Sequence, residues 1–472
     1  MFNGDSWQDD FEDRSIGELI AMYRQIKDGE ADVSLSEEEF ELLIDYFYQE
    51  GEEQEAIEVC ELAQVFYPFS SSILLLKAEI LFHVQKFGQV LLTLDEYDRL
   101  ELQSIDSIIL RSDIYKAQHR YDDAIGLLKF KLDQFEGKEH VDLLLELSEV
   151  YDETEAYEDV FYTLKRVLEI DYRSDEALHK ISFWTNFTKL FDEGIALHQY
   201  IVNEDPYNAL AWFNLGAAFQ GKKEYLSAID AYEFCIVIDP KFEFAYRNLA
   251  DAFIRLKWYK KAIRALNKHM ELTKPEDVIY EALGLSYEKL KLYDQARHYY
   301  ILATDLDPAD EDLHYKVGSL YGKEGKWATA LRHFERALSL NKEHVKSLQG
   351  LGVALLQLED LEMGFAFLKK ATTIKIKNIT PWLKYIKELI KHEAFEEAKD
   401  AIEEAYYHIG EHIDLLYLDA TNHFGLGKAK EGMIILENAL AIDHKKSRMI
   451  FSLMPDLRER VSVVQLISKY KK

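Results

Sequence analysis

A repeat of 34 residues constrains the fold of this 472-residue chain more than any other feature. In the stretch 209–242, two groups of apolar and small residues follow each other: Trp212, Leu215, Gly216 and Phe219, then Ala228, Tyr232, Cys235 and Pro240. At about 100° per residue, the first four side chains share one face of a helix. Proline ends the second segment because it lacks a backbone N–H and its ring excludes the preceding helical turn. The stretch therefore predicts two helices that pack on each other.

The same pattern recurs along the chain in both directions. Steps of 34 residues, with a two-residue insertion at 139–140, give these unit starts: Glu37, Ser71, Ile105, Val141, Asp175, Ala209, Glu243, Asp277, Glu311, Val345, Ile379 and Ile413. The position where the second helix crosses the first is Ala or Gly in ten of these twelve units, which lets the two backbones approach closely. One unit cannot bury both of its faces alone, so an array is expected.

This spacing and these residue types resemble the tetratricopeptide repeat. The resemblance covers residues 37–446 and implies an all-α, right-handed α-solenoid, a superhelix of about twelve helix–turn–helix units. Outside the repeats we expect an acidic disordered tail at 1–14, an N-terminal capping helix and linker at 15–36, and a C-terminal capping helix at 447–472.

Charge is distributed unevenly along the chain. Residues 1–208 hold 17 Lys and Arg against 48 Asp and Glu, whereas residues 209–472 hold 39 against 38. A field of this sign repels nucleic acids and anionic membrane surfaces and favours basic partners. The sequence contains no apolar run typical of a signal peptide or a membrane span, so we expect a cytoplasmic protein with no nucleic acid partner and no membrane insertion. Cys60 and Cys235 are expected to be buried free thiols.

No catalytic, metal or cofactor site is expected. His408, Glu411 and His412 match the H-x-x-E-H string of a class of zinc proteases, but that string needs one continuous helix. Gly410 stands inside it, at the position where other units place the proline that ends a helix. Glycine-rich phosphate loops are also absent from the sequence. Because the repeats fill nearly the whole chain, we expect no enzyme activity and no cofactor.

The resemblance implies that the first helices line a concave, peptide-binding groove. The ninth position of the first helix, opposite the packing face, is acidic in each of the first four units: Asp45, Glu79, Asp113 and Glu149. Lys116 is the one basic residue that this pattern places beside them. We expect the four carboxylates to attract a basic peptide segment, and the alternative is a solvated acidic surface without a binding role.

Aromatic side chains occupy groove positions further along the chain. Phe183, Phe187 and Phe213 have no packing partner evident in the sequence and are predicted anchors for a peptide. Packing between neighbouring repeats is the alternative.

A third group of groove positions is polar: Asn214, Arg247, Asn248, Asp251 and Arg255. These residues are predicted to contact the peptide, and the spacing of four between the charged ones is equally typical of a salt-bridge row on a helix surface. The carboxylate clamp that some family members use to hold a chaperone's C-terminus is incomplete here.

These patterns together predict a non-enzymatic protein–protein interaction scaffold or adaptor that binds a basic or amphipathic peptide segment in its groove. A self-assembling structural protein, and therefore a homo-oligomer, is one alternative. A chaperone-like assembly factor is the other.

Overall fold

The computed structural model describes residues 14–29, 34–101 and 104–470. The predicted acidic tail lies outside the described residues, except for Arg14. Every regular element in the described chain is a helix, and none of these helices is long and apolar enough to cross a membrane. The chain divides into two compact units, Met1–Asp239 and Pro240–Lys472.

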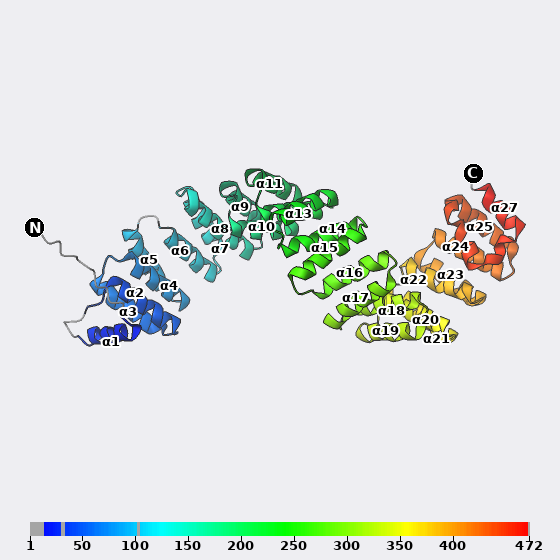
Figure 1. Ribbon diagram of the computed structural model, residues 1–472, viewed down its shortest axis with the longest axis horizontal. Coiled ribbons are helices and arrows are strands. Elements are labelled where there is room, and N and C mark those ends of the chain that lie inside the picture. Colours follow the sequence, from blue (N-terminus) through cyan, green and yellow to red (C-terminus); the bar gives the residue numbers. More distant parts are fainter. Residues whose placement is uncertain (1–13, 30–33, 102–103, 471–472) are drawn as a thin grey trace, which may run out of the picture. The chain divides into compact units, whose positions relative to one another are not determined.

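The N-terminal unit holds one preceding helix and six helix pairs, in the blue to green part of Figure 1. Its helices are α1 (Ile16–Lys27), α2 (Glu37–Gln49), α3 (Glu53–Phe66), α4 (Ser71–His83), α5 (Phe87–Leu100), α6 (Ile105–Ala117), α7 (Tyr121–Leu132), α8 (Gly137–Glu153), α9 (Tyr157–Ile170), α10 (Asp175–Thr188), α11 (Phe191–Glu204), α12 (Ala209–Gly221) and α13 (Tyr225–Ile238).

The C-terminal unit holds six further helix pairs and a short closing segment. Its α-helices are α14 (Glu243–Arg255), α15 (Tyr259–Leu272), α16 (Asp277–Lys289), α17 (Tyr293–Leu306), α18 (Glu311–Lys323), α19 (Trp327–Leu340), α20 (Val345–Gln357), α21 (Leu361–Ile374), α22 (Ile379–Lys391), α23 (Phe395–Ile409), α24 (Ile413–Gly425), α25 (Ala429–Asp443), α26 (Arg448–Leu453) and α27 (Val461–Lys469). Two short 3₁₀ helices, η1 (His444–Ser447) and η2 (Pro455–Arg458), lie among the last of them.

In each unit the helices form an α-solenoid. Each even-numbered first helix packs on the second helix that follows it, and that second helix packs on the next first helix. Successive first helices also contact each other, as α2 does α4, α4 does α6, and α6 does α8. In the N-terminal unit the first helices therefore form one wall, on which side chains of neighbouring repeats can meet.

Local sequence signals explain where the helices start and turn. Several first helices begin after a side chain that accepts a hydrogen bond from a backbone N–H of the first turn: Ser36, Ser70, Ser104, Ser174, Asn208, Asp310 and Asn378. The turn into the second helix is the same throughout, because the fifteenth residue of each of the twelve repeat units, counted from the predicted unit starts, has a φ between +57° and +77°. These residues are Gly51, Gln85, His119, Glu155, Lys189, Lys223, Lys257, Lys291, Gly325, Glu359, Glu393 and Gly427.

The seam between paired helices needs small residues on one side and large ones on the other. A Cβ added at Gly216 would lie 2.6 Å from the ring of Tyr232, and one added at Gly284 would lie 2.5 Å from the ring of Tyr300. Tyr232 and Tyr300 are fully buried. The glycines are therefore required for the close approach of the two helices at these points.

The start of one first helix differs from the predicted boundary. Helix α8 begins at Gly137, four residues before the predicted Val141, so the two inserted residues lie within a longer helix. His140 Nδ1 lies 3.1 Å from the carbonyl oxygens of both Leu132 and Phe135, which ties this longer start to the preceding turn.

The single C-terminal capping helix predicted at 447–472 is wrong. The described part of that segment forms α26, η2 and α27. Pro455 opens η2 and cannot donate a backbone hydrogen bond to continue α26, which is why one helix does not span the segment.

Candidate peptide-binding surface

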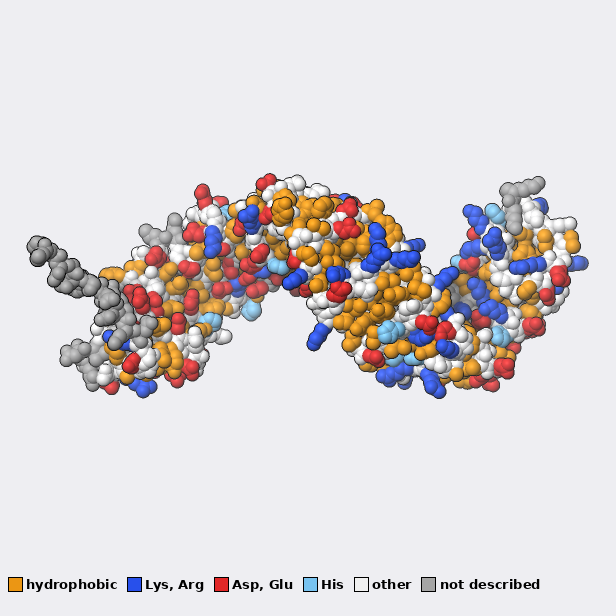
Figure 2. Space-filling model, viewed as in Figure 1, with side chains coloured by type: hydrophobic (Ala, Val, Ile, Leu, Met, Phe, Trp, Pro, Cys, Tyr) orange, Lys and Arg blue, Asp and Glu red, His pale blue; other side chains and the backbone are white. Residues whose placement is uncertain are grey.

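Acidic side chains follow one another on the first helices of the N-terminal unit. We call the row the acidic strip and define it by these residues of α2, α4, α6, α8 and α10: Asp45, Glu79, Asp106, Asp113, Glu146, Glu149 and Glu176. Residues 1–239 hold 19 Lys and Arg against 52 Asp and Glu, and Figure 2 shows many acidic side chains on the visible face of this unit. The strip has two parts that differ in how its charge is balanced.

The first part, the unpaired half, consists of Asp45, Glu79 and Asp106. The neighbouring helices displace water around Glu79, and this raises the pKa of its carboxyl. Nearby Asp106 and Asp45 raise the pKa further, and His83 lowers it. Glu79 therefore lies within electrostatic range of a carboxylate on the first helix before it and of one on the first helix after it. Within the described part of the chain, no ion pair joins any of the three to a basic residue.

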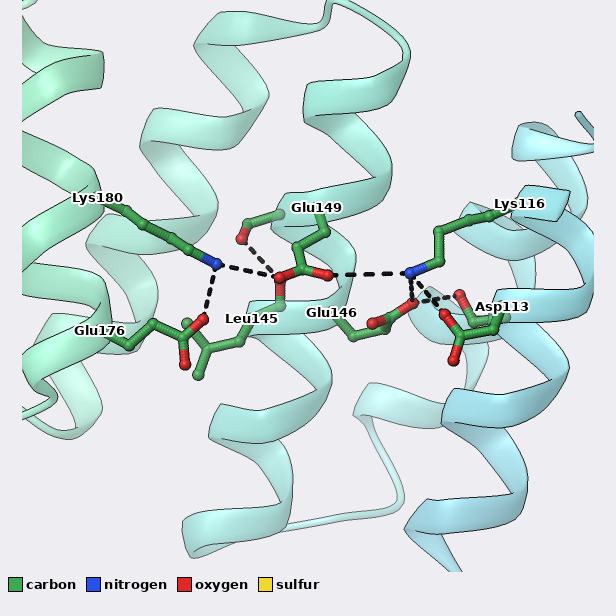
Figure 3. Close-up of polar contacts among 9 residues, drawn as sticks. Asp113, Lys116, Leu145, Glu146, Glu149, Glu176 and Lys180 are labelled. Carbon is green, nitrogen blue, oxygen red and sulfur yellow. Dashed lines mark hydrogen bonds and ion pairs between the residues drawn. The ribbon is translucent and has the colours of Figure 1, made fainter. Parts of the chain in front are cut away.

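The second part, the paired half, is held by lysines of the chain itself (Figure 3). Lys116 Nζ lies 2.7 Å from Asp113 Oδ1, 2.8 Å from Glu146 Oε1 and 3.9 Å from Glu149 Oε2. The side chains of Lys116 and Glu146 are only 12% and 9% exposed, and the Ser112 hydroxyl donates a 2.8 Å hydrogen bond to Glu146. Lys116 thus links α6 to α8 in a largely buried ion pair.

Burial acts on the pKa values of both partners in this pair. Burial lowers the pKa of Lys116, but its hydrogen bonds to Asp113 and Glu146 outweigh this and leave the pKa raised. Burial raises the pKa of Glu146, although Lys116 and Ser112 act in the opposite direction. The Lys116 ammonium is therefore held in its charged form.

A second lysine extends the paired half to α10. Lys180 Nζ lies 3.1 Å from Glu149 Oε1 and 2.7 Å from Glu176 Oε1, so Glu149 bridges the lysines of two different first helices. The sequence pattern missed Lys180 because it stands at another helix position, 31 residues from Glu149. A search for opposite charges about one repeat apart would have found it.

The predicted aromatic residues do have packing partners. Phe183 and Phe187 stack on each other, with ring centroids 5.9 Å apart, and both contact the Trp184 ring. The Phe187 ring also meets Tyr157 edge-on at 4.7 Å. Phe183 and Phe187 are still 59% and 53% exposed. Packing between repeats and an open aromatic surface are therefore both present at this cluster.

Phe213 and Asn214 lie elsewhere on α12. The half-buried Phe213 ring lies 5.8 Å from the ring of Tyr232. Asn214 is only 2% exposed, and its amide donates a 2.7 Å hydrogen bond to the carbonyl oxygen of Leu178. The prediction that Asn214 contacts a peptide is corrected by this geometry, because its donor is used inside the repeat core.

The remaining predicted polar residues lie on α14 of the C-terminal unit. Arg255 pairs with Asp251 at 3.3 Å, and Arg247 pairs with Glu276 at 3.4 Å. Asn248, next to Arg247 in sequence, is half-buried. The Arg255–Asp251 pair is spaced by four on one helix surface, as in the alternative of a salt-bridge row, whereas Arg247 contacts Glu276 at the start of α16.

Two family models match the helix pairs of the C-terminal unit. Residues 278–310 match one model described as the tetratricopeptide repeat, and residues 315–378 match another of the same description. The matched segments cover α16 to α21, which have the same paired helices and turns as the rest of the described chain. The chain contains tetratricopeptide repeats. Arrays of these repeats are protein–protein interaction scaffolds.

No curated protein matches this tetratricopeptide repeat protein in sequence. Among solved structures it is similar to YrrB, titled a TPR protein with an unusual peptide-binding site, at 20% identity over 39% of this chain and 95% of that one, with a TM-score of 0.36. It is similar to Cut9 with Hcn1, an APC/C hetero-tetramer, at 14% identity over 86% and 98%, with a TM-score of 0.37. It is also similar to MamA from Desulfovibrio magneticus RS-1, at 18% identity over 36% and 96%, with a TM-score of 0.34.

Proposed function

We propose that this protein is a non-enzymatic, cytoplasmic scaffold that binds a basic peptide segment along the acidic strip of its N-terminal unit. The observation that carries the proposal is the unpaired half. Asp106 and Asp45 both act electrostatically on Glu79, yet no lysine or arginine of the described chain pairs with any of the three. Buried free thiols at Cys60 and Cys235 fit a reducing compartment.

The paired half is a guide to how a partner would be held. Lys116 and Lys180 each place an ammonium between carboxylates of successive first helices. Asp45 lies two repeats before Asp113, and Glu79 lies one repeat before it. A lysine or arginine of the partner can take the place beside Asp45 and Glu79 that Lys116 takes beside Asp113. A charge pair at 4 Å contributes roughly 1 kcal/mol in water and about 4 kcal/mol near a protein surface, so several such contacts give a useful affinity.

The exposed aromatic cluster at Phe183 and Phe187 follows the strip along the same wall of first helices. Exposed aromatic rings on a binding surface supply contact area that salt does not screen. In the proposal the strip steers the basic segment and the two rings hold an apolar side chain of the same segment.

A labelled 12-residue peptide of alternating lysine and glycine tests this function, measured by fluorescence anisotropy with the full chain. We expect it to bind, and we expect the same peptide with glutamate in place of lysine not to bind. Asp45→Asn with Glu79→Gln should weaken binding of the lysine peptide by about fivefold, which corresponds to about 1 kcal/mol. Equal binding of both peptides, or no effect of the two substitutions, would sink the proposal.

Self-assembly is the second candidate function. Residues 447–472 carry six Lys and Arg against two Asp and Glu, so this basic segment of one copy could dock on the acidic strip of another. Sedimentation velocity of the full chain at low and high salt tests it, because oligomers that separate into monomers at high salt support self-assembly. A monomer at every salt concentration excludes it.

A further inference from the structure

A pocket of about 410 Å³ lies among α11, α12 and α13 of the N-terminal unit. Its apolar lining includes the rings of Trp212, Phe219 and Phe234, and Ser227 and Asp230 of α13 also line it. The Trp212 and Phe234 rings stack at 4.5 Å, which fixes one wall. None of the lining residues belongs to the acidic strip. Gln199 and Asn203 of α11 add further polar groups, so the lining combines aromatic rings with several polar side chains, both of which can contact a ligand.

Large apolar side chains surround this pocket on the surface. Leu226, Phe234 and Val237 of α13 are 59%, 53% and 78% exposed, and Tyr200 of α11 and Tyr207 beyond it are 43% and 82% exposed. Figure 2 shows hydrophobic side chains gathered over α11 and α13. Leu226 and Val237 stand eleven residues apart on one helix, which is about 16 Å along its axis. An apolar stripe of three helical turns has the same length.

The charged residues of α11 and α13 are all acidic. Helices α11 and α13 contain five carboxylates and no lysine or arginine: Asp192, Glu193, Glu204, Asp230 and Glu233. One of these, Asp192, pairs with Lys222 at 2.5 Å. Of the others, Asp230 lines the pocket and Glu233 lies on the same helix, and neither α11 nor α13 contains a basic residue to balance them. A partner that places apolar side chains in the centre and Lys or Arg at its edges is complementary to this surface.

The backbone restricts the form that such a partner can take. An extended peptide gains affinity by adding a strand to a sheet edge, but α11 and α13 use their backbone groups in their own helical hydrogen bonds. A helix needs no backbone partner and presents apolar side chains at spacings of three and four. The surface therefore suits a helical occupant better than an extended one.

From these observations we infer that the pocket between α11 and α13 is a second docking site, for an amphipathic helix of another protein with an apolar stripe flanked by lysine or arginine. One large apolar side chain of that helix fills the pocket against Trp212 and Phe234. Flanking basic side chains lie near Asp230 and Glu233. This site is distinct from the acidic strip and does not depend on it.

The test uses the full chain and two 18-residue peptides measured by isothermal titration calorimetry. One peptide carries leucines and a central phenylalanine on one helical face, with lysines beside them. The other has serine at those face positions and the same lysines. The second peptide reports binding to the acidic strip alone, so the affinity ratio of the two peptides measures the pocket's share. We expect a ratio of at least about tenfold, equivalent to about 1.4 kcal/mol.

Substitutions then locate the site. Ser227→Trp fills the pocket while adding apolar surface, so it should reduce the ratio to about one if the pocket itself binds. Asp230→Lys should lower the affinity of the leucine peptide by about fivefold through charge alone. Asp45→Asn with Glu79→Gln should weaken both peptides and leave their ratio unchanged. Circular dichroism melting checks that each variant is folded.

Several results would overturn the inference. A ratio near one in the unsubstituted chain shows that the surface does not prefer an amphipathic helix. An unchanged ratio in both folded variants, Ser227→Trp and Asp230→Lys, places the apolar contact elsewhere. Binding of the chain to neutral phosphatidylcholine vesicles in preference to the leucine peptide assigns the apolar surface to a membrane instead.

Discussion

The two halves of the acidic strip have similar side chains and opposite electrostatic settings. In the paired half, Lys116 and Lys180 neutralise carboxylates of α6, α8 and α10, and the Lys116–Glu146 pair is largely buried. In the unpaired half, Asp45 and Glu79 stand at the same helix position as Asp113 and Glu149 but lack a basic partner in the described chain. The same residue type at the same repeat position can therefore stabilise the fold in the paired half and be available to bind a ligand in the unpaired half.

The largest expected effect is on the paired half. Lys116→Met leaves Glu146 largely buried with only Ser112 as a partner, and breaking a buried pair in this way costs about 3 kcal/mol or more. Because repeats open locally, hydrogen exchange of the α6 and α8 amides should report the loss. Lys180→Met is the control, with an expected cost below about 1 kcal/mol, since Lys180 and its partners are more exposed.

A second substitution should rescue the first. Glu146→Gln added to Lys116→Met removes the unpaired charge and keeps an acceptor for Ser112, so protection of α6 and α8 should largely return. If Lys116→Met and Lys180→Met have equal effects, or if Glu146→Gln gives no rescue, the paired half has no structural role.

Neutralising one carboxylate of each half should change stability in opposite directions at neutral pH. Glu149→Gln removes two lysine contacts and should lower the free energy of unfolding by about 0.5 kcal/mol. Glu79→Gln removes a charge that its surroundings disfavour, so it should raise the free energy of unfolding by up to about 0.5 kcal/mol. The value is small because water screens this side chain. Thermal melting of the two variants beside the unsubstituted chain measures both, and changes of the same sign would refute the distinction.

The smallest effect concerns pH. The pKa of Glu79 is raised on folding, so the folded state binds its proton more tightly than the unfolded state does. The stability contributed by this group is present below the unfolded pKa and is lost as pH rises through the folded pKa. The stability of Glu79→Gln relative to the unsubstituted chain should therefore rise between mildly acidic and neutral pH, and melting curves should show a larger rise for this variant than for Asp45→Asn. Identical pH profiles would show that Glu79 is not perturbed.

Binding should respond to pH in the opposite sense from stability. A cationic partner favours the charged form of Glu79, so affinity for a lysine peptide should fall as pH drops through the raised pKa of Glu79. Glu79→Gln should remove this part of the pH dependence. Titrations of the same peptide at several pH values check it.

The repeat spacing was sufficient to predict most helix starts, because each first helix must present its apolar face at the same place in every unit. The spacing is not sufficient where the contacts of a side chain depend on residues of another helix. Arg111 occupies a seam position where the pattern asks for an apolar residue, yet α6 begins at the predicted Ile105, because Arg111 pairs with Asp95 and Asp98 of the preceding helix. The inward bond of Asn214 to Leu178 could not be seen from spacing alone for the same reason.

The predicted site was incomplete in a related way. The ninth-position carboxylates were visible as a periodic pattern, whereas the division between paired and unpaired carboxylates depends on Lys180, which lies at a different position of the next repeat. The handedness of the solenoid and the peptide-binding role of Phe183, Phe187 and Phe213 stay predictions, as do those of Arg247, Asn248, Asp251 and Arg255.

The salt dependence of lysine-peptide binding tests the central claim most directly. Affinity for the alternating lysine peptide is measured by calorimetry at several salt concentrations for the unsubstituted chain, for Asp45→Asn with Glu79→Gln, and for Glu53→Gln with Glu96→Gln. The last variant removes the same charge from exposed positions on the second helices of the same two repeats. We expect Asp45→Asn with Glu79→Gln to lower the affinity about fivefold and to flatten its salt dependence, while the control variant changes neither. Equal effects of the two variants would contradict it, because binding would then follow net charge and not the unpaired half of the strip.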